Sequence, residues 1–84
     1  MKELLPPFSE MARSLKCGIY EHYKKKDQYE LIAVGRHSET LEEYVIYRAL
    51  YGDGGYWIRP VQMFCEQVRD NGKEVPRFQF ISSF

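Results

Sequence analysis

The feature that most constrains this fold is a change in hydrophobic period at Gly18. From that residue on, apolar and polar residues alternate in short runs, which is the pattern of half-buried β-strands. Turn-forming residues separate the runs at Lys24–Asp27, His37–Leu41, Gly52–Gly55 and Asn71-Gly72. Short strands joined by tight turns pair as antiparallel neighbours, and a chain of 84 residues makes one domain with a thin core.

The alternation predicts five to six short strands. They span Ile19–Tyr23, Tyr29–Arg36, Glu42–Leu50, Tyr56–Arg59, Cys65–Arg69 and Arg77–Ile81. Pro60 suits the first position of a helix, so we expect one helical turn over Val61–Phe64. This layout is typical of small closed or half-closed barrels, and we therefore predict an all-β fold, a small SH3-like barrel.

The third predicted strand carries large side chains on both faces. Its two faces are Val45, Tyr47, Ala49 and Tyr51 on one side, and Tyr44, Ile46, Arg48 and Leu50 on the other. A sheet with one solvated face would show a polar side, so we expect one face inside the barrel and the other covered by the N-terminal arm, the C-terminal strand or a partner. The predicted core contains Ile32, Val34, Val45, Ile58, Val61 and Phe64, with Leu31, Tyr44 and Ile46 as alternatives.

Residues 1–16 follow a different pattern. Pro6-Pro7 prevents an early helix, and Ser9 can cap a short helix over Glu10–Lys16. Three apolar residues share one stripe of that helix: Phe8, Met11 and Leu15. We predict that this N-terminal arm or short helix docks on the barrel formed by residues 17–84, with a partner-binding arm as the alternative.

Charge and cysteine content argue against a non-specific nucleic-acid binder and against a disulfide-rich secreted protein. Lysine plus arginine equal aspartate plus glutamate at 12 each, whereas non-specific nucleic-acid binders usually carry a positive excess. Cys17 and Cys65 form no C-x-x-C pair, so we expect two free thiols, no disulfide and a cytoplasmic protein. The sequence shows no signal peptide and no run of the about 18–20 apolar residues that a membrane span needs, so no membrane partner is predicted.

Several separate motifs resemble one known family. They are Gly18–Lys24, Arg36–Glu43, Tyr47–Gly52, Trp57–Pro60, Met63-Phe64 and Gly72–Phe78. In this order they resemble the bacterial domain-of-unknown-function family numbered 1653, over about Gly18 to Phe80. The sequence departs from the family pattern in the turn at Lys25–Gln28, and residues 1–16 lie outside it. The resemblance implies a small SH3-like barrel and implies no activity.

The run His37–Thr40 combines an imidazole, hydroxyls and a carboxylate, the groups that acid–base and nucleophilic catalysis use. Neighbouring side chains on an extended chain point apart, so we interpret the run as a turn in which the Ser38 and Thr40 hydroxyls bond the backbone. An enzyme that uses His37 with Glu39 is the less favoured hypothesis. The potential metal ligands match no zinc spacing: Cys17, His22, His37 and Cys65. We therefore predict no metal and no other cofactor.

Arginines lie on three successive predicted strands, among aromatic residues. Guanidinium forks bind carboxylate or phosphate, and aromatic faces stack on flat groups. The candidate ligand-binding set is Arg36, His37, Arg48, Tyr51, Trp57 and Arg59. Because Arg48 and Tyr51 lie on opposite faces of their strand, we expect only part of the set to share a patch. In the alternative, the arginines are structural and pair with Glu39, Glu42, Glu43 or Asp53.

These observations favour a small binding module for an anionic or aromatic ligand, a peptide or a nucleic-acid segment. The alternative is a protein–protein interaction or oligomerisation domain, with a protein partner or a second copy on the same apolar face. Fold alone does not decide between them. A concave positive patch would favour a ligand, and a flat apolar patch that symmetry can bury would favour oligomerisation.

Overall fold

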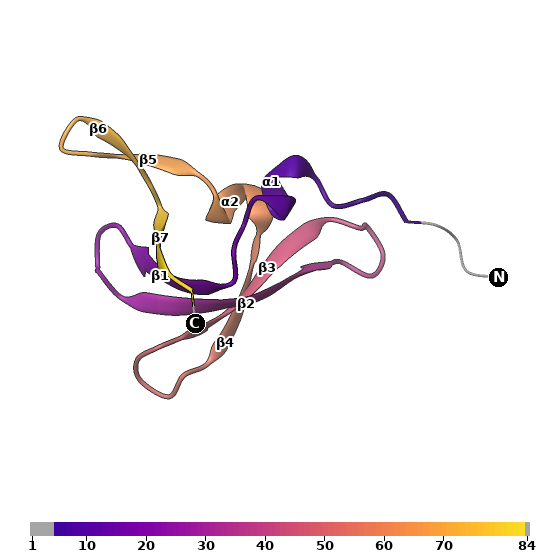
Figure 1. Ribbon diagram of the computed structural model, residues 1–84, viewed down its shortest axis with the longest axis horizontal. Helices are drawn as coiled ribbons and strands as arrows, with labels where there is room; N and C mark the ends of the chain where they lie inside the picture. Colours follow the sequence, from indigo (N-terminus) through magenta and orange to yellow (C-terminus); the bar gives the residue numbers. More distant parts are fainter. Residues whose placement is uncertain (1–4, 84) are drawn as a thin grey trace.

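Strand-forming runs and turns alternate along residues 5–83, the part of the chain that the computed structural model describes. This part holds seven strands and two helices of one turn each (Figure 1). In chain order they are α1 (Glu10–Arg13), β1 (Gly18–His22), β2 (Gln28–Arg36), β3 (Glu43–Ala49), β4 (Tyr56–Pro60), α2 (Val61–Phe64), β5 (Gln67–Asp70), β6 (Lys73–Pro76) and β7 (Phe78–Ser82). The predicted all-β fold class is therefore confirmed.

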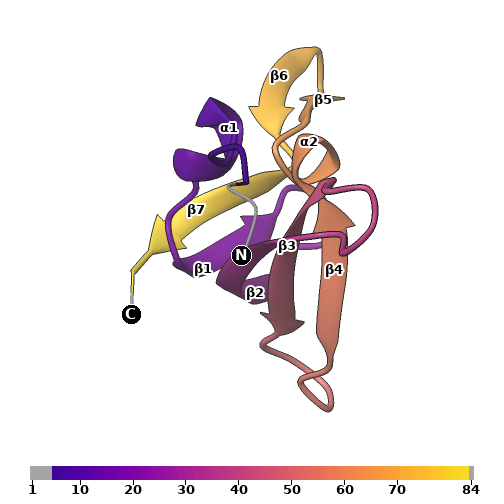
Figure 2. The ribbon, with the colours of Figure 1, turned by 90° about the vertical axis from the view of Figure 1, so that its right-hand side faces the viewer.

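Within residues 5–83, five strands form one antiparallel sheet in the order β4-β3-β2-β1-β7. The first four strands pair with their sequence neighbours, because short turns connect them. β7 returns from the end of the chain to pair with β1, so β4 and β7 form the two edges. In Figure 2, β1 and β7 run across the direction of β3 and β4, which shows a strong twist. The finer description as an SH3-like barrel stays a prediction.

The structure contains one strand, β6, that was not predicted from the sequence. The Asn71-Gly72 turn has positive φ at both residues, as a tight hairpin turn requires, and it joins β5 to β6 in a hairpin of their own. The chain then bends at Arg77, where the backbone bonds switch partners: its N–H donates to Glu66, and its carbonyl accepts from Tyr23. β7 therefore belongs to the large sheet. The predicted single strand Arg77–Ile81 missed β6, which Pro76 ends.

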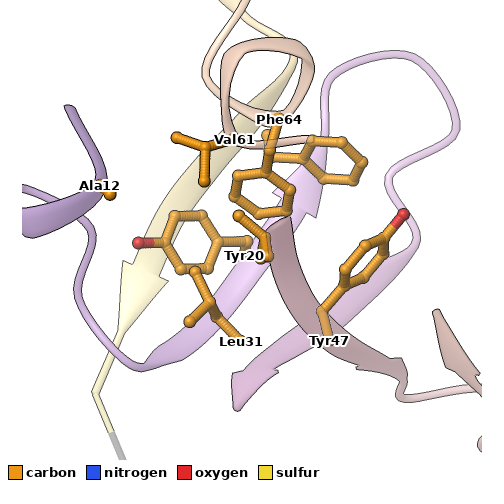
Figure 3. Close-up of a cluster of buried hydrophobic side chains, with 8 residues drawn as sticks. Ala12, Tyr20, Leu31, Tyr47, Val61 and Phe64 are labelled. Atoms are coloured by element: carbon orange, nitrogen blue, oxygen red, sulfur yellow. The ribbon is translucent and has the colours of Figure 1, made fainter. Parts of the chain in front are cut away.

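The core lies on one face of the large sheet, here called the inner face. Leu31, Val45 and Tyr47 supply the sheet side, with exposed fractions of 2%, 0% and 4%. Figure 3 shows Val61 and Phe64 of α2 packing down on them. The Phe64 ring stacks on Phe78 with centroids 4.4 Å apart, and further aromatic rings meet the pair edge-on. Aromatic rings thus fill a core that few residues can supply.

A β-bulge in β2 explains why Ile32 is not in the core. Leu31 pairs with Tyr47 and Ala33 pairs with Ile46, so Ile32 is an extra residue without a partner. The bulge shifts the alternation, and Ile32 becomes 37% exposed while Leu31 is buried. Of the predicted core residues, Val45, Val61 and Phe64 are buried and Val34 packs at its margin. The prediction that Ile32 and Ile58 belong to the core was wrong, because both side chains are exposed.

The N-terminal arm packs against the inner face. α1 ends at Arg13 instead of the predicted Lys16, and Ala12, not Met11, is its buried residue. Ser9 caps the helix by accepting from the Ala12 N–H, and its own N–H and hydroxyl donate to Glu43 at 2.6 Å each. Phe8 and Leu15 lie at the margin of the core. Residues 1–4 of the predicted arm lie outside the described residues.

Tyr20 ties the arm to β1. Its buried hydroxyl donates to the Lys16 carbonyl at 2.8 Å and accepts from the Lys16 N–H at 3.1 Å. Gly18 lets β1 approach the end of β7, because its φ of 146° and the nearby Ser82 carbonyl leave no room for a Cβ. The arm, β1 and β7 therefore enclose one side of the core.

The other face of the sheet, here called the outer face, carries Ile32, Tyr44, Ile46, Arg48, Tyr56 and Ile58. Tyr56 and Ile58 on β4 are 69% and 67% exposed. Both the arm and α2 lie against the inner face, so neither covers these side chains. The outer face is left to solvent or to a partner.

Candidate functional site

An aromatic hollow of about 210 Å³ lies at the end of the inner face next to β4. Its walls are Tyr29 of β2, Tyr47 of β3, Tyr51 of the following turn, and Trp57 and Arg59 of β4. Sheet pairing brings these residues together, because Tyr47 lies opposite Trp57 and Val45 opposite Arg59, while Tyr29 pairs with Ala49. The aromatic hollow is thus built on three adjacent strands.

The tyrosines of the hollow form one connected cluster. The Tyr29 ring meets Tyr47 and Tyr51 edge-on, with centroids 5.4 and 5.6 Å apart. The Tyr29 and Tyr51 hydroxyls share a hydrogen bond of 2.9 Å. Burial and this bond raise the pKa of Tyr29 far above 10.0, so its hydroxyl is neutral at physiological pH. The cluster therefore offers flat aromatic faces and hydroxyl groups.

Arg59 supplies the positive charge of the hollow. Its Nε donates to the Tyr47 hydroxyl at 3.2 Å, and its guanidinium lies 5.5 Å from the centre of the Phe78 ring. Among the ion pairs of residues 5–83, none involves Arg59. A guanidinium held by aromatic groups without a carboxylate retains its capacity for an anionic partner.

Two other predicted arginines have partners within the fold. Arg48 lies directly across the outer face from Glu30, and its Nε donates to that carboxylate at 2.7 Å. Arg36 extends to the N-terminal arm, where it donates to the Pro6 carbonyl at 2.6 Å and lies 3.9 Å from the centre of the Phe8 ring. Each arginine thus already has partners, although not the carboxylates named from the sequence.

His37 organises the turn between β2 and β3. Its Nδ1 accepts from the Glu39 N–H at 3.1 Å and from the Thr40 N–H at 3.2 Å. The Thr40 hydroxyl accepts from the Glu42 N–H, and Leu41 adopts a φ of 65°. The structure therefore agrees with the interpretation of this run as a turn, with the imidazole in the role expected of Ser38.

Of the six candidates, the structure brings Tyr51, Trp57 and Arg59 together and separates the others. Tyr47 and Tyr29 were missed. Tyr47 was within reach of sequence analysis, because a hairpin centred on Gly52 places it opposite Trp57. Tyr29 was not, because it joins the site through the pairing of β2 with β3, whose register depends on the bulge at Ile32.

Two further observations concern metal ligands and membrane-spanning helices in the described part of the chain. Residues 5–83 contain no group of three or more histidine, cysteine, aspartate or glutamate side chains placed to hold a metal ion. No helix in this part is both long and apolar enough to cross a membrane. Cys17 and Cys65 are both free thiols, and burial raises the pKa of Cys65.

Comparison with known proteins places the chain beside proteins without an assigned activity. The sequence profile of a family described as "Protein of unknown function (DUF1653)" matches residues 18–80. The chain is also similar to a DUF1653 protein from Bordetella bronchiseptica, known from a crystal structure, with 29% identity and a TM-score of 0.77. That alignment covers 87% of this chain and 95% of the other. No curated protein matches the chain.

Proposed function

Because the chain belongs to the DUF1653 family, whose description assigns no activity, its function has to be argued from its own surface, and we propose that it is a binding module. The aromatic hollow is its ligand site. The ligand presents a flat ring next to an anionic group. Cytoplasmic location is part of the proposal, since both cysteines are free thiols.

The observation that carries the proposal is the position of Arg59, which lines the aromatic hollow and forms no ion pair within residues 5–83. The other arginines of the large sheet are held by Glu30 or by the N-terminal arm, whereas Arg59 lies among aromatic rings at the rim of a hollow. Beside it, Trp57 is 57% exposed and Tyr51 is 47% exposed. Exposed aromatic faces beside a planar cation suit a flat anionic group.

The size of the hollow limits what it can hold. About 210 Å³ is below the roughly 300–1,000 Å³ of sites that enclose a whole drug-sized ligand. The hollow therefore takes one ring of a larger or partly exposed molecule, such as a base of a nucleotide or a proline of a peptide. With a net charge of zero, long-range attraction for a polyanion contributes little, so short contacts must provide the selectivity.

The fluorescence of Trp57 tests the proposal, because it is the only tryptophan of the chain and lines the hollow. Mononucleotides, short single-stranded oligonucleotides and proline-rich peptides ending in a carboxylate are titrated separately. We expect a saturable change with one class. Arg59→Ala should weaken that binding by about ten- to a hundredfold, the effect of losing a hydrogen bond to a charged group.

The matched control is Arg48→Ala on the outer face, which removes the same charge and should leave the affinity unchanged. Added salt should weaken binding of an anionic ligand in the native protein more than in Arg59→Ala. A ligand whose affinity is the same in both variants and in the native protein would show that Arg59 is structural and that the aromatic hollow is not the site.

A further inference from the structure

The two edges of the large sheet differ in how they are protected. At the β7 edge, Ile19 pairs with Ser82 and Tyr20 with Phe80, so Ile81 is a bulge that interrupts the strand. Bulges are one means by which proteins prevent an edge strand from pairing with another chain. β4 pairs with β3 without interruption from Tyr56 to Pro60, and Figure 2 shows it as an outermost strand of the sheet. The β4 edge therefore lacks that protection.

The hydrogen-bond alternation identifies the free groups of β4. Ala49 donates to the Gly55 carbonyl, so the alternate residues Trp57 and Arg59 direct their backbone groups toward β3. The backbone groups of Tyr56 and Ile58 then point away from the sheet. Pro60 is in phase with Tyr56 and Ile58, so its backbone also points away from β3. Because proline has no N–H, this position costs no hydrogen bond to β3.

From this edge we infer that the protein forms a symmetric dimer in which β4 pairs antiparallel with β4 of a second copy. With Trp57 on the two-fold axis, Tyr56 faces Ile58 of the second copy, and both residues of each pair exchange their outward N–H and C=O groups. If the two-fold axis were shifted toward Pro60, that residue would enter the pairing without an N–H to donate. If the axis were shifted toward Gly55, the pairing would extend into the turn before β4. One register thus satisfies the outward groups on both copies.

The side chains fit the same register. In antiparallel pairing, directly opposed residues lie on one face, so Tyr56 packs on Ile58 of the second copy across the outer face. The two Trp57 side chains meet on the inner face at a pair without hydrogen bonds, where side chains approach most closely. None of the three residues is charged, and their exposed fractions are 69%, 57% and 67%. A second copy would therefore cover the most exposed apolar part of the sheet.

The area sets the strength of the dimer. Aromatic side chains bury about 150–250 Å² when fully covered. Tyr56 and Trp57 are already partly buried, so together with the smaller Ile58 they contribute roughly 300–400 Å² per copy. Stable interfaces bury about 800 Å² per partner. The dimer is accordingly weak and dissociates on dilution, with the backbone hydrogen bonds setting its register.

Two measurements test the dimer. In sedimentation or light scattering, the apparent mass of the native protein should double between about 10 µM and 1 mM, the range in which small interfaces assemble. Over the same range, amide exchange of Tyr56 and Ile58 should slow at least severalfold, whereas Trp57 and Arg59, bonded to β3, are protected throughout and serve as internal controls. Ile58→Lys should remain monomeric, and Ile32→Lys, on the same face but away from the edge, should dimerise normally.

A protein that stays monomeric at about 1 mM would overturn the inference. So would a dimer in which Tyr56 and Ile58 exchange as fast as in the monomer, since such a dimer uses another surface. Ile58 points away from the aromatic hollow, so Ile58→Lys leaves the proposed ligand site intact. Because Trp57 lines the hollow and also lies on the two-fold axis of the dimer, ligand binding is measured on the Ile58→Lys monomer, where a loss of binding bears on the proposed function alone.

Discussion

The inner and outer faces of the large sheet are built from similar residues but have different surroundings. Leu31, Val45 and Tyr47 on the inner face are almost fully buried, whereas Tyr56 and Ile58 on the outer face are more than half exposed. β-branched and aromatic residues occur on both faces because both belong to strands. What distinguishes the faces is the cover of the inner face, which α1 from the N-terminal arm, α2 directly after β4 and Phe78 of β7 supply. Burial here is decided by the segments that cover a face, not by the residue types of the strands.

The largest expected effect separates two adjacent residues. Leu31→Ala removes a side chain that is 2% exposed and should lower the free energy of unfolding by about 2–5 kcal/mol. Ile32→Ala removes the same number of carbons one position later, on the bulge, and should cost less than about 1 kcal/mol. Urea denaturation of both variants measures the difference. Equal losses would show that the bulge does not divide the two faces.

The next effect concerns the cover of the inner face. Ser9→Ala removes the cap of α1 and the hydroxyl bond to Glu43, and should lower the free energy of unfolding by about 0.5–2 kcal/mol. Met11→Ala in the same helix is the control, because Met11 is 45% exposed and alanine favours helix. If both variants match the native protein, α1 adds nothing to the stability of the inner face.

A smaller effect depends on pH. His22 packs edge-on against Phe78, with ring centroids 5.3 Å apart. Burial lowers the pKa of His22 below its ordinary value of 6.5, and the nearby positive charges of Arg77 and Lys25 add to this. The folded state thus favours the neutral ring. Stability from His22 is present above pH 6.5 and is lost as the pH falls through the lower folded-state pKa.

The melting temperature should therefore decrease between about pH 7 and pH 5, and His22→Gln should flatten this decrease. An identical pH profile for the variant would mean that His22 does not titrate differently in the folded and unfolded states. Glu43 contributes in the same direction at lower pH, because its bonds from Ser9 lower its pKa below 4.5.

The smallest effect is expected from chelation. Neither face of the sheet in residues 5–83 presents a cluster of metal-ligating side chains, so excess chelator should leave the melting temperature unchanged. Thermal unfolding followed by circular dichroism, with and without chelator, measures this. A clear decrease would reveal a structural metal and contradict the expectation.

The sequence predicted the elements better than their faces. Turn residues located β1 to β4 and α2 to within one or two residues, because glycine and polar turns act locally. The alternation failed where one residue was inserted at Ile32, since every side chain beyond a bulge changes phase. β6 was missed because it pairs only with β5, in a hairpin separate from the large sheet that β7 joins.

The candidate site shows the same limit. Tyr51, Trp57 and Arg59 lie together because they belong to one hairpin, β3–β4, whose turn is visible in the sequence. Arg36 and Arg48 were chosen by residue type, but their partners come from the arm and from β2. Residue type indicated the chemistry of a site, whereas the tertiary pairing determined which residues share it.

The position of β7 also has a consequence for the order of folding. The pairs β1–β2, β2–β3 and β3–β4 each close a short loop, so they form at low entropic cost. The β1–β7 ladder joins Ile19 to Ser82 and must close a much longer loop, which contains all the other strands of the sheet. We therefore expect the meander to assemble first and β7 to add last. A chain in which β7 has not yet paired would then present the open edge of β1 that lies opposite β2, which makes the addition of β7 the step that completes the sheet.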